Sequence, residues 1–454
     1  MDDSLVDRKQ YEPPIESAAT VHVSLEGIHG TIEVPHHQAG FWQQWRAFIG
    51  PAILVSVGYM DPGNWGTDLA AGAQFKYGLL WVVGLASLMA IFMQVISARL
   101  GVVTGKDLAQ CCRDWYPGWT RWPNWLLCEL AIGACDLAEV LGSAVALNLM
   151  FHIPLFWAVI ITGLDVLLLL TLQRFGMRTI EAVVVLLIAT IAVCYWLEIF
   201  VLPQTHPNFL EMGKGLITPN FRHAGMIYVA IGIIGATVMP HNLYLHSSLV
   251  QTRAFGFEPK QRREALRYAI FDSTFALGFA LFINAAILVL GAAAFHSRGM
   301  HEVAEIADAY KLLTPVLGAS LASVLFACAL LASGQNSTLT GTLAGQIVME
   351  GFLQIRLKPW LRRLITRSVA IIPAIVVIGI WGEGKVTALI ILSQVVLSFQ
   401  LPFAVIPLVR FTSDRRKMGE FANSRITAIV SWIVAAVILG LNFEYLWLIY
   451  RGAA

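Results

Sequence analysis

Two long apolar stretches of this chain are each interrupted near the middle by a short polar motif that contains proline. Residues 61–64 read Asp-Pro-Gly-Asn, and residues 239–242 read Met-Pro-His-Asn. An interrupted helix exposes backbone amides and carbonyls that lipid cannot satisfy, so such a break persists only where it lines a cavity or binds something. Two breaks at matching positions of two halves indicate a binding site near the middle of a membrane.

The composition supports a membrane protein. Of 454 residues, 57% are hydrophobic and only 13% are charged, and the mean hydropathy is +0.68. Soluble domains carry about 25% charged residues, and a soluble protein as apolar as this one could not cover its surface with polar groups. The net charge of +2 and the lack of a basic stripe give no reason to expect a nucleic-acid partner.

Apolar stretches long enough to cross a bilayer need about 17–25 residues. The chain contains eleven of them, which predicts an all-α polytopic membrane protein whose transmembrane domain covers residues 45–451. Residues 1–44 are polar and carry no signal-peptide pattern, so we expect a disordered cytoplasmic tail there. The predicted spans are 47–73, 78–101, 123–151, 154–173, 178–202, 223–253, 265–296, 319–353, 364–383, 386–411 and 426–450.

The distribution of Lys and Arg predicts the orientation. With a cytoplasmic N-terminus, 24 of the 31 cations fall in cytoplasmic segments, as the positive-inside rule requires. The C-terminus is then outside, and we expect a multi-pass protein of the cell inner (plasma) membrane. The two motifs lie in the first and sixth spans, an offset of five, which is an odd number, so the halves enter the membrane from opposite sides. We therefore predict inverted repeats over about 45–203 and 220–411, followed by an eleventh helix at 426–450.

Asp61 is the first candidate functional residue. A carboxylate at the centre of a membrane costs at least ~2.5–3.5 kcal/mol, so it needs a proton, a cation or an arginine as partner. Asn64 adds an amide oxygen, and the inner half-helix ends near Gly58 with free carbonyls at the negative end of its dipole. Together these groups favour a cation. The alternative is that Asp61 only caps the outer half-helix that begins at Pro62.

Met239 indicates which kind of cation would bind. Alkali ions, Ca²⁺ and Mg²⁺ take hard oxygen ligands, whereas a thioether favours softer transition metals. The Ala236 carbonyl at the second break would complete a set that suits Mn²⁺, Fe²⁺, Co²⁺ or Cd²⁺. The alternative is that Met239 is an ordinary core methionine, one of twelve in the chain.

Three acidic residues lie in the third predicted span. Glu129, Asp136 and Glu139 are separated by seven and three residues, so they share one helical face. Because such a face is costly against lipid, it should point to protein or water. His241 in the second motif titrates near neutrality and is a further candidate for handling protons.

The two motifs, the eleven spans and the polar stretch at residues 334–342 resemble the Nramp family of proton-coupled divalent metal transporters, bacterial MntH type, over about residues 45–450. The resemblance implies a LeuT-like fold. It also implies metal ligation by Asp61, Asn64, Met239 and the Ala236 carbonyl, with Gln394 joining in some states. This family usually has alanine at the position of Gly58, where only the carbonyl is used.

The same resemblance implies a proton path from Asp61 through Asp136 and Glu139, with Arg363 and also Arg362 as cationic partners. We therefore expect a transporter, not an enzyme, that imports Mn²⁺ and also Fe²⁺, Cd²⁺ or Co²⁺ with protons by alternating access. No cofactor is expected besides the transported ions. The expected partners are metal ions, protons and membrane lipids, and we expect a monomer.

Other readings remain open at this point. A diverged relative could be uncoupled from protons or permissive for Mg²⁺. A sodium-coupled amino-acid transporter on the same fold would leave Asp61 repelling the substrate carboxylate and Met239 unexplained. An intramembrane enzyme would need a motif such as HExxH or GxSxG, and the sequence has neither. A channel also tolerates broken helices, but inverted breaks favour alternating access.

Overall fold

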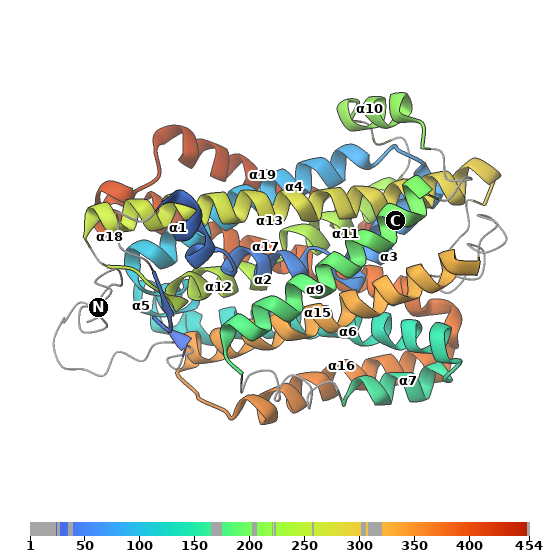
Figure 1. Ribbon diagram of the computed structural model, residues 1–454, viewed down its shortest axis with the longest axis horizontal. Helices are drawn as coiled ribbons and strands as arrows, with labels where there is room; N and C mark the ends of the chain where they lie inside the picture. The colour runs from blue at the N-terminus through green and yellow to red at the C-terminus, as the bar shows by residue number, and fades with distance from the viewer. Residues whose placement is uncertain are drawn as a thin grey trace.

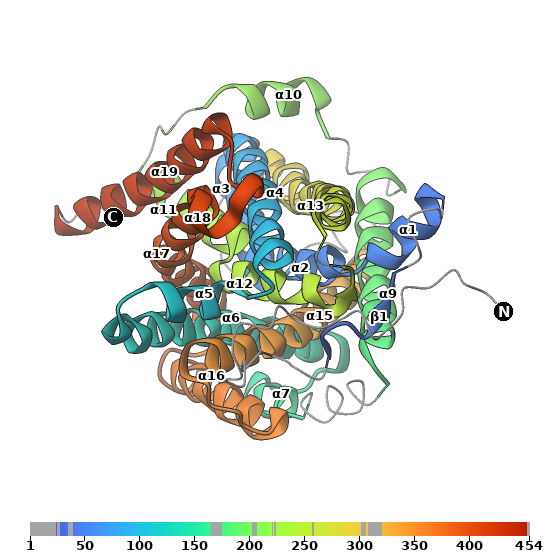
Figure 2. The same cartoon turned by 90° about the vertical axis from the view of Figure 1, so that its left-hand side faces the viewer.

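The described residues of the computed structural model form a helical bundle, and eight of their helices are long and apolar enough to cross a membrane. Figure 1 shows the long helices running roughly along one axis, and Figure 2 views the same bundle from its end. The structure describes residues 40–164, 175–201, 207–219, 224–256, 258–300 and 320–451, together with residues 24, 28–34, 221 and 306.

Every predicted span has a counterpart among the described helices. The fourth span is described only as far as Leu164, because residues 165–174 lie outside the described part of the chain. The helices of the bundle are α2 (Pro51–Gly58), α3 (Pro62–Phe75), α4 (Leu80–Thr104), α6 (Arg121–Phe151), α7 (Leu155–Thr162), α9 (Met177–Trp196), α11 (Ala224–Val238), α12 (Pro240–Leu249), α13 (Pro259–Ala294), α15 (Ser320–Leu353), α16 (Pro359–Trp381), α17 (Val386–Ser413) and α19 (Arg425–Tyr450).

The first and sixth spans are broken, as the motifs predict. In the first span, α2 ends at Gly58 and α3 begins at Pro62. The Asp61 carboxylate accepts the backbone N–H of Asn64 at 2.8 Å and so caps α3. The capping role weighed from the sequence is therefore present, and it uses only one oxygen of the carboxylate.

The second break is built differently. Helix α11 ends at Val238 and α12 begins at Pro240, and the residue between them, Met239, has φ 22° and ψ 106°. A positive φ is strained for a side chain of this size and persists only where the surroundings enforce it. Helices α11 and α17 approach closely just before this break, because a Cβ on Gly235 would overlap the backbone carbonyl of Gln394.

The segment predicted as a disordered tail is partly ordered, which corrects that expectation for residues 28–34 and 41–44. Strand β1 (Ile32–Glu33) pairs in parallel with β2 (Arg253–Ala254), the segment that follows α12. Gly30 also donates its N–H to the Gln251 carbonyl at 3.0 Å, and α1 (Phe41–Phe48) precedes α2. Residues 1–23, 25–27 and 35–39 lie outside the described residues.

Candidate metal-binding site

The two broken helices meet at the centre of the bundle. Asp61, Asn64, Ala236 and Met239 are completely buried. A Cβ placed on Gly58, at the end of α2, would lie 3.1 Å from the Met239 sulfur. The fold therefore brings together the residues that the two motifs predict.

The Asn64 side-chain amide joins the two breaks. In the orientation that satisfies its hydrogen bonds, its nitrogen donates to Asp61 Oδ1 at 2.7 Å and to the Ala236 carbonyl at 3.2 Å, and its oxygen accepts from Asn284 Nδ2 at 3.1 Å. Turning the amide over would place its oxygen beside the other two oxygens, and adjacent oxygen ligands of an octahedral ion with ~2.1 Å bonds are about 3 Å apart. A cation would then replace the amide nitrogen as the partner of Asp61 and Ala236.

The Met239 sulfur belongs to the second break and lies close to Gly58 of the first. It accepts a hydrogen bond from Asn242 Nδ2 at 3.4 Å, and the side-chain oxygen of Asn242 has no partner among the described residues. A Cβ on Gly58 would overlap that Asn242 amide. The glycine thus makes room for Asn242 beside the sulfur.

Gln394 of α17 also adjoins the site. A Cβ on Gly63 would overlap the Gln394 amide, so the two residues touch directly. Its nitrogen donates to Ser393 Oγ at 2.9 Å, whereas its oxygen is buried and unpartnered among the described residues. No group of three or more His, Cys, Asp or Glu side chains that could hold a metal ion occurs in the described part of the chain. The site is instead a mixed set of carboxylate, amide, carbonyl and thioether.

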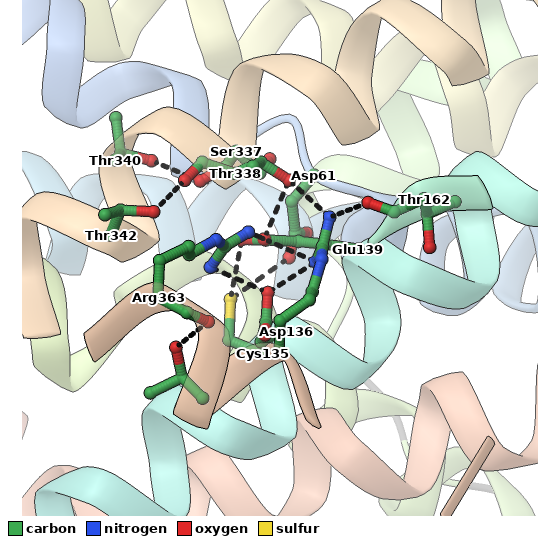
Figure 3. Close-up of polar contacts among 12 residues, drawn as sticks. Asp61, Cys135, Asp136, Glu139, Thr162, Ser337, Thr338, Thr340, Thr342 and Arg363 are labelled. Atoms are coloured by element: carbon green, nitrogen blue, oxygen red, sulfur yellow. Dashed lines mark hydrogen bonds and ion pairs between the residues drawn. The ribbon is translucent and has the colours of Figure 1, made fainter. Parts of the chain in front are cut away.

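Cys135 of α6 links this site to the predicted acidic face. Its sulfur lies 3.8 Å from Asp61 Oδ2 and 3.7 Å from Glu139 Oε1. Thr338 of α15 donates to the other oxygen of Glu139 at 3.2 Å. Figure 3 shows that Cys135 contacts both Asp61 and Glu139, and that Thr338 of α15 contacts Glu139.

Two arginines of α16 hold the acidic face. Arg363 lies 3.0 Å from Asp136 Oδ1, and Arg367 lies 2.5 Å from the same oxygen. Both also reach Glu139 Oε2, at 3.7 and 3.8 Å respectively. Arg363 therefore contacts two of the three acids of the third predicted span (Figure 3). Sequence reasoning missed Arg367, although its position four residues after Arg363 places both on one helical face.

Two further predicted residues lie apart from this cluster. Arg362 pairs with Glu129 at 2.6 Å, an ion pair separate from the one at Asp136. His241 is only 2% exposed, and its Nδ1 has no partner among the described residues. Within the same residues, no hydrogen bond or ion pair joins His241 to Asp61 or Glu139.

Sequence reasoning also missed several polar residues around the breaks. The Thr237 hydroxyl lies 3.4 Å from the Asn64 side-chain amide, and Ser333 of α15 donates to the Met60 carbonyl at 2.5 Å. Asp68, a completely buried acid of α3, was detectable because it follows Asp61 by seven residues in an apolar segment.

Comparisons with known proteins agree with this architecture. Residues 52–448 match the family model "Natural resistance-associated macrophage protein-like", Nramp. The chain is 57% identical over 421 residues to a divalent metal cation transporter MntH of Nostoc sp., covering 92% of this chain and 94% of the relative. The corresponding protein of Mesorhizobium japonicum is 54% identical over 430 residues, with 93% of each chain covered.

Solved structures give the same result. An Eremococcus coleocola manganese transporter superposes with a TM-score of 0.85 at 40% identity, covering 92% of this chain and 90% of the other. Mhp1, a nucleobase-cation-symport-1 family transporter, superposes with a TM-score of 0.59 at 13% identity, covering 89% and 92%, which shows a shared fold alone. The fold is LeuT-like, and the chain belongs to the Nramp family.

Proposed function

We propose that this protein transports divalent transition-metal cations across the membrane and binds them between the two broken helices. The observation that carries the proposal is the burial of Asp61, Asn64, Ala236 and Met239 together at the two breaks, where the Asn64 amide joins Asp61 Oδ1 to the Ala236 carbonyl. The similarity to MntH transporters and to a manganese transporter supports this assignment over an enzymatic role.

The ligand set favours Mn²⁺, with Fe²⁺, Cd²⁺ and Co²⁺ as further substrates. Asp61 and Asn64 supply hard oxygens, and Met239 supplies the softer sulfur that discriminates against Ca²⁺ and Mg²⁺. The Gly58 carbonyl at the end of α2 and the unpartnered oxygen of Gln394 would complete the coordination. All of these residues are buried, so the cation must enter and leave through conformational change, as alternating access requires.

The chain of contacts that leaves the metal site supports proton coupling. A divalent cation at Asp61 displaces any proton there, and Cys135 connects Asp61 Oδ2 with Glu139 Oε1 by contacts of 3.8 and 3.7 Å. Arg363 and Arg367 then hold Glu139 beside Asp136. We propose that protons move inward along this route, with His241, Arg362 and Glu129 further along or beside it. The N-terminus would be cytoplasmic and the C-terminus outside, in the plasma membrane of a monomeric protein.

The test is Mn²⁺ uptake into proteoliposomes that contain the purified protein under an inward proton gradient. Uptake that resists excess Ca²⁺ and Mg²⁺ and is accompanied by internal acidification supports a proton-coupled transition-metal importer. Uptake that Mg²⁺ suppresses, or that moves no protons, points to a permissive or uncoupled relative. A liposome without protein gives the background, and absence of any metal uptake above it overturns the proposal.

A further inference from the structure

A second carboxylate, Asp68, lies in α3 beyond the cap formed by Asp61. Its side chain is completely buried, and neither of its oxygens has a hydrogen-bond partner among the described residues. Asp61 and Asp68 are seven residues apart, which is two helical turns and about 10 Å along the axis. A buried acid without a donor or counter-ion is costly, so the site needs either a proton or a cation.

The contacts of α3 with α13 locate Asp68. The Asn64 amide lies 3.1 Å from Asn284 Nδ2, and a Cβ on Gly72 would overlap the Leu288 carbonyl. Asn64, Asp68 and Gly72 are spaced four residues apart and so form one stripe. Asp68 therefore lies on the face of α3 that packs against α13, away from lipid.

Asn284 is the second polar group on this path. It is 1% exposed, and its side-chain oxygen has no partner among the described residues. Its nitrogen is the atom that faces Asn64. The same amide thus adjoins the central site through nitrogen and leaves an oxygen acceptor unused between α3 and α13.

We infer that Asp68 and the Asn284 side-chain oxygen form an outer subsite that takes a divalent transition-metal cation before it reaches Asp61. The inference rests on the proposed transport function and on the orientation in which α3 is the outer half of the first span. A carboxylate and an amide oxygen suit Mn²⁺, and water would fill its remaining positions. This subsite has no sulfur ligand like Met239, so it captures the cation and leaves the discrimination between metal ions to the central site.

Transport kinetics test this subsite. Asp68→Asn keeps the shape of the side chain and removes the charge, so the KM for Mn²⁺ uptake in proteoliposomes should rise about fivefold to tenfold with the maximal rate within a factor of two. The matched control is Thr67→Val. Thr67 is buried in the same helix, and its hydroxyl donates only to the Gly63 and Asn64 carbonyls of α3 among the described residues. An unchanged KM in Asp68→Asn, or an equal rise in KM in Thr67→Val, overturns the inference. Mn²⁺ uptake by the wild type would still support the proposed function in that case.

Direct binding separates the two sites without requiring transport. Mn²⁺ bound to the purified protein is counted by electron paramagnetic resonance as loss of the free-ion signal. Asp61→Ala should retain a weak Mn²⁺ site, and Asp61→Ala combined with Asp68→Asn should lose it. If Asp61→Ala alone binds no Mn²⁺ above the detergent background, no outer subsite exists. Asn284→Asp adds a charge there and should tighten the weak site, and a weaker site in that variant contradicts the assignment.

Discussion

The carboxylates of α3 and those of α6 are equally buried but differently partnered. Asp136 and Glu139 of α6 lie within 4 Å of two guanidinium groups. Asp61 and Asp68 of α3 have no ion pair in the described part of the chain, and each is completely buried. Asp61 receives an N–H bond on one oxygen, whereas Asp68 receives none.

This difference separates acids that have counter-ions within the protein from acids that have none among the described residues. Arg363 and Arg367 offset the charge of Asp136 and Glu139, and removing one partner from such a buried pair leaves an uncompensated charge. Asp61 and Asp68 must obtain a neutralising charge from outside, either as a proton or as a metal ion. A transported cation would therefore neutralise these two carboxylates directly.

The largest effect is expected at Asp61. Asp61→Ala removes the only carboxylate of the proposed central site, so Mn²⁺ uptake into proteoliposomes should fall to the background of empty vesicles. Ser56→Ala is the control, because Ser56 is buried in α2 and bonds only to Ile53 of its own helix among the described residues. Substantial Mn²⁺ uptake by Asp61→Ala would show that the transported cation does not need the Asp61 carboxylate.

The next effect tests the paired acids of α6. Arg367→Met leaves Asp136 and Glu139 with a single guanidinium, and breaking a buried pair costs about 3–5 kcal/mol. We expect a lower unfolding midpoint in detergent and a reduced proton flux for each Mn²⁺ transported. Arg263→Met is the control, since Arg263 pairs with Glu420 in an exposed ion pair outside the proposed proton route. Equal losses of proton flux in both variants would mean that the loss does not depend on the pairing of Asp136 and Glu139.

A smaller effect is expected on selectivity. Met239→Ala removes the sulfur but leaves all the oxygen ligands, so Mn²⁺ uptake should persist while Ca²⁺ and Mg²⁺ begin to compete. A tenfold lower inhibition constant for Ca²⁺ would correspond to about 1.4 kcal/mol. Met239→Leu keeps the volume and distinguishes loss of sulfur from an opened cavity. If Met239→Leu retains wild-type selectivity, the sulfur has no part in it.

The smallest effect on transport is expected at Asp107, a buried carboxylate outside the membrane spans. It caps α5 (Leu108–Trp115) by accepting the Gln110 N–H at 2.9 Å, and burial raises its pKa to about 6. Because the folded pKa lies above the unfolded value, this group contributes stability below the unfolded pKa near 4, and the contribution of up to about 3 kcal/mol is lost as pH rises through 6.

Asp107→Asn keeps the cap, since asparagine is an equally good N-cap residue, and it removes the titration. The unfolding midpoint of this variant should therefore vary less between pH 4 and pH 7 than that of the wild type, with Mn²⁺ uptake unchanged. Asp114→Asn, at a partly exposed acid of the same helix, is the control. A pH profile identical to that of the wild type would show that burial does not govern this carboxyl.

The residues of the metal site were accessible to sequence reasoning because they interrupt a local pattern. Asp61, Asn64 and Met239 stand out as polar or sulfur-bearing groups where an apolar helix should continue. Glu129, Asp136 and Glu139 stand out for the same reason, and their spacing defines one face. The count of spans also follows from local hydropathy, since the bilayer sets a minimum length.

Contacts between distant segments were not accessible in this way. Cys135 is a common buried residue type, and only its position between Asp61 and Glu139 gives it a role in the proposed proton route. Arg367 is one of many cations until α16 packs on α6. The pairing of β1 with β2 joins a tail segment to a loop more than 200 residues away, for which a polar sequence carries no signal.

The sequence by itself determined the class of this protein, the two breaks and the chemical types of the candidate ligands, because hydropathy and helix interruption depend on neighbouring residues. Only the tertiary structure decided that the Asn64 amide joins Asp61 to the Ala236 carbonyl, and that Arg367 joins Arg363. It also left both oxygens of Asp68 and the side-chain oxygen of Asn284 without partners among the described residues. These features depend on how separate helices pack, and packing is set by the whole chain.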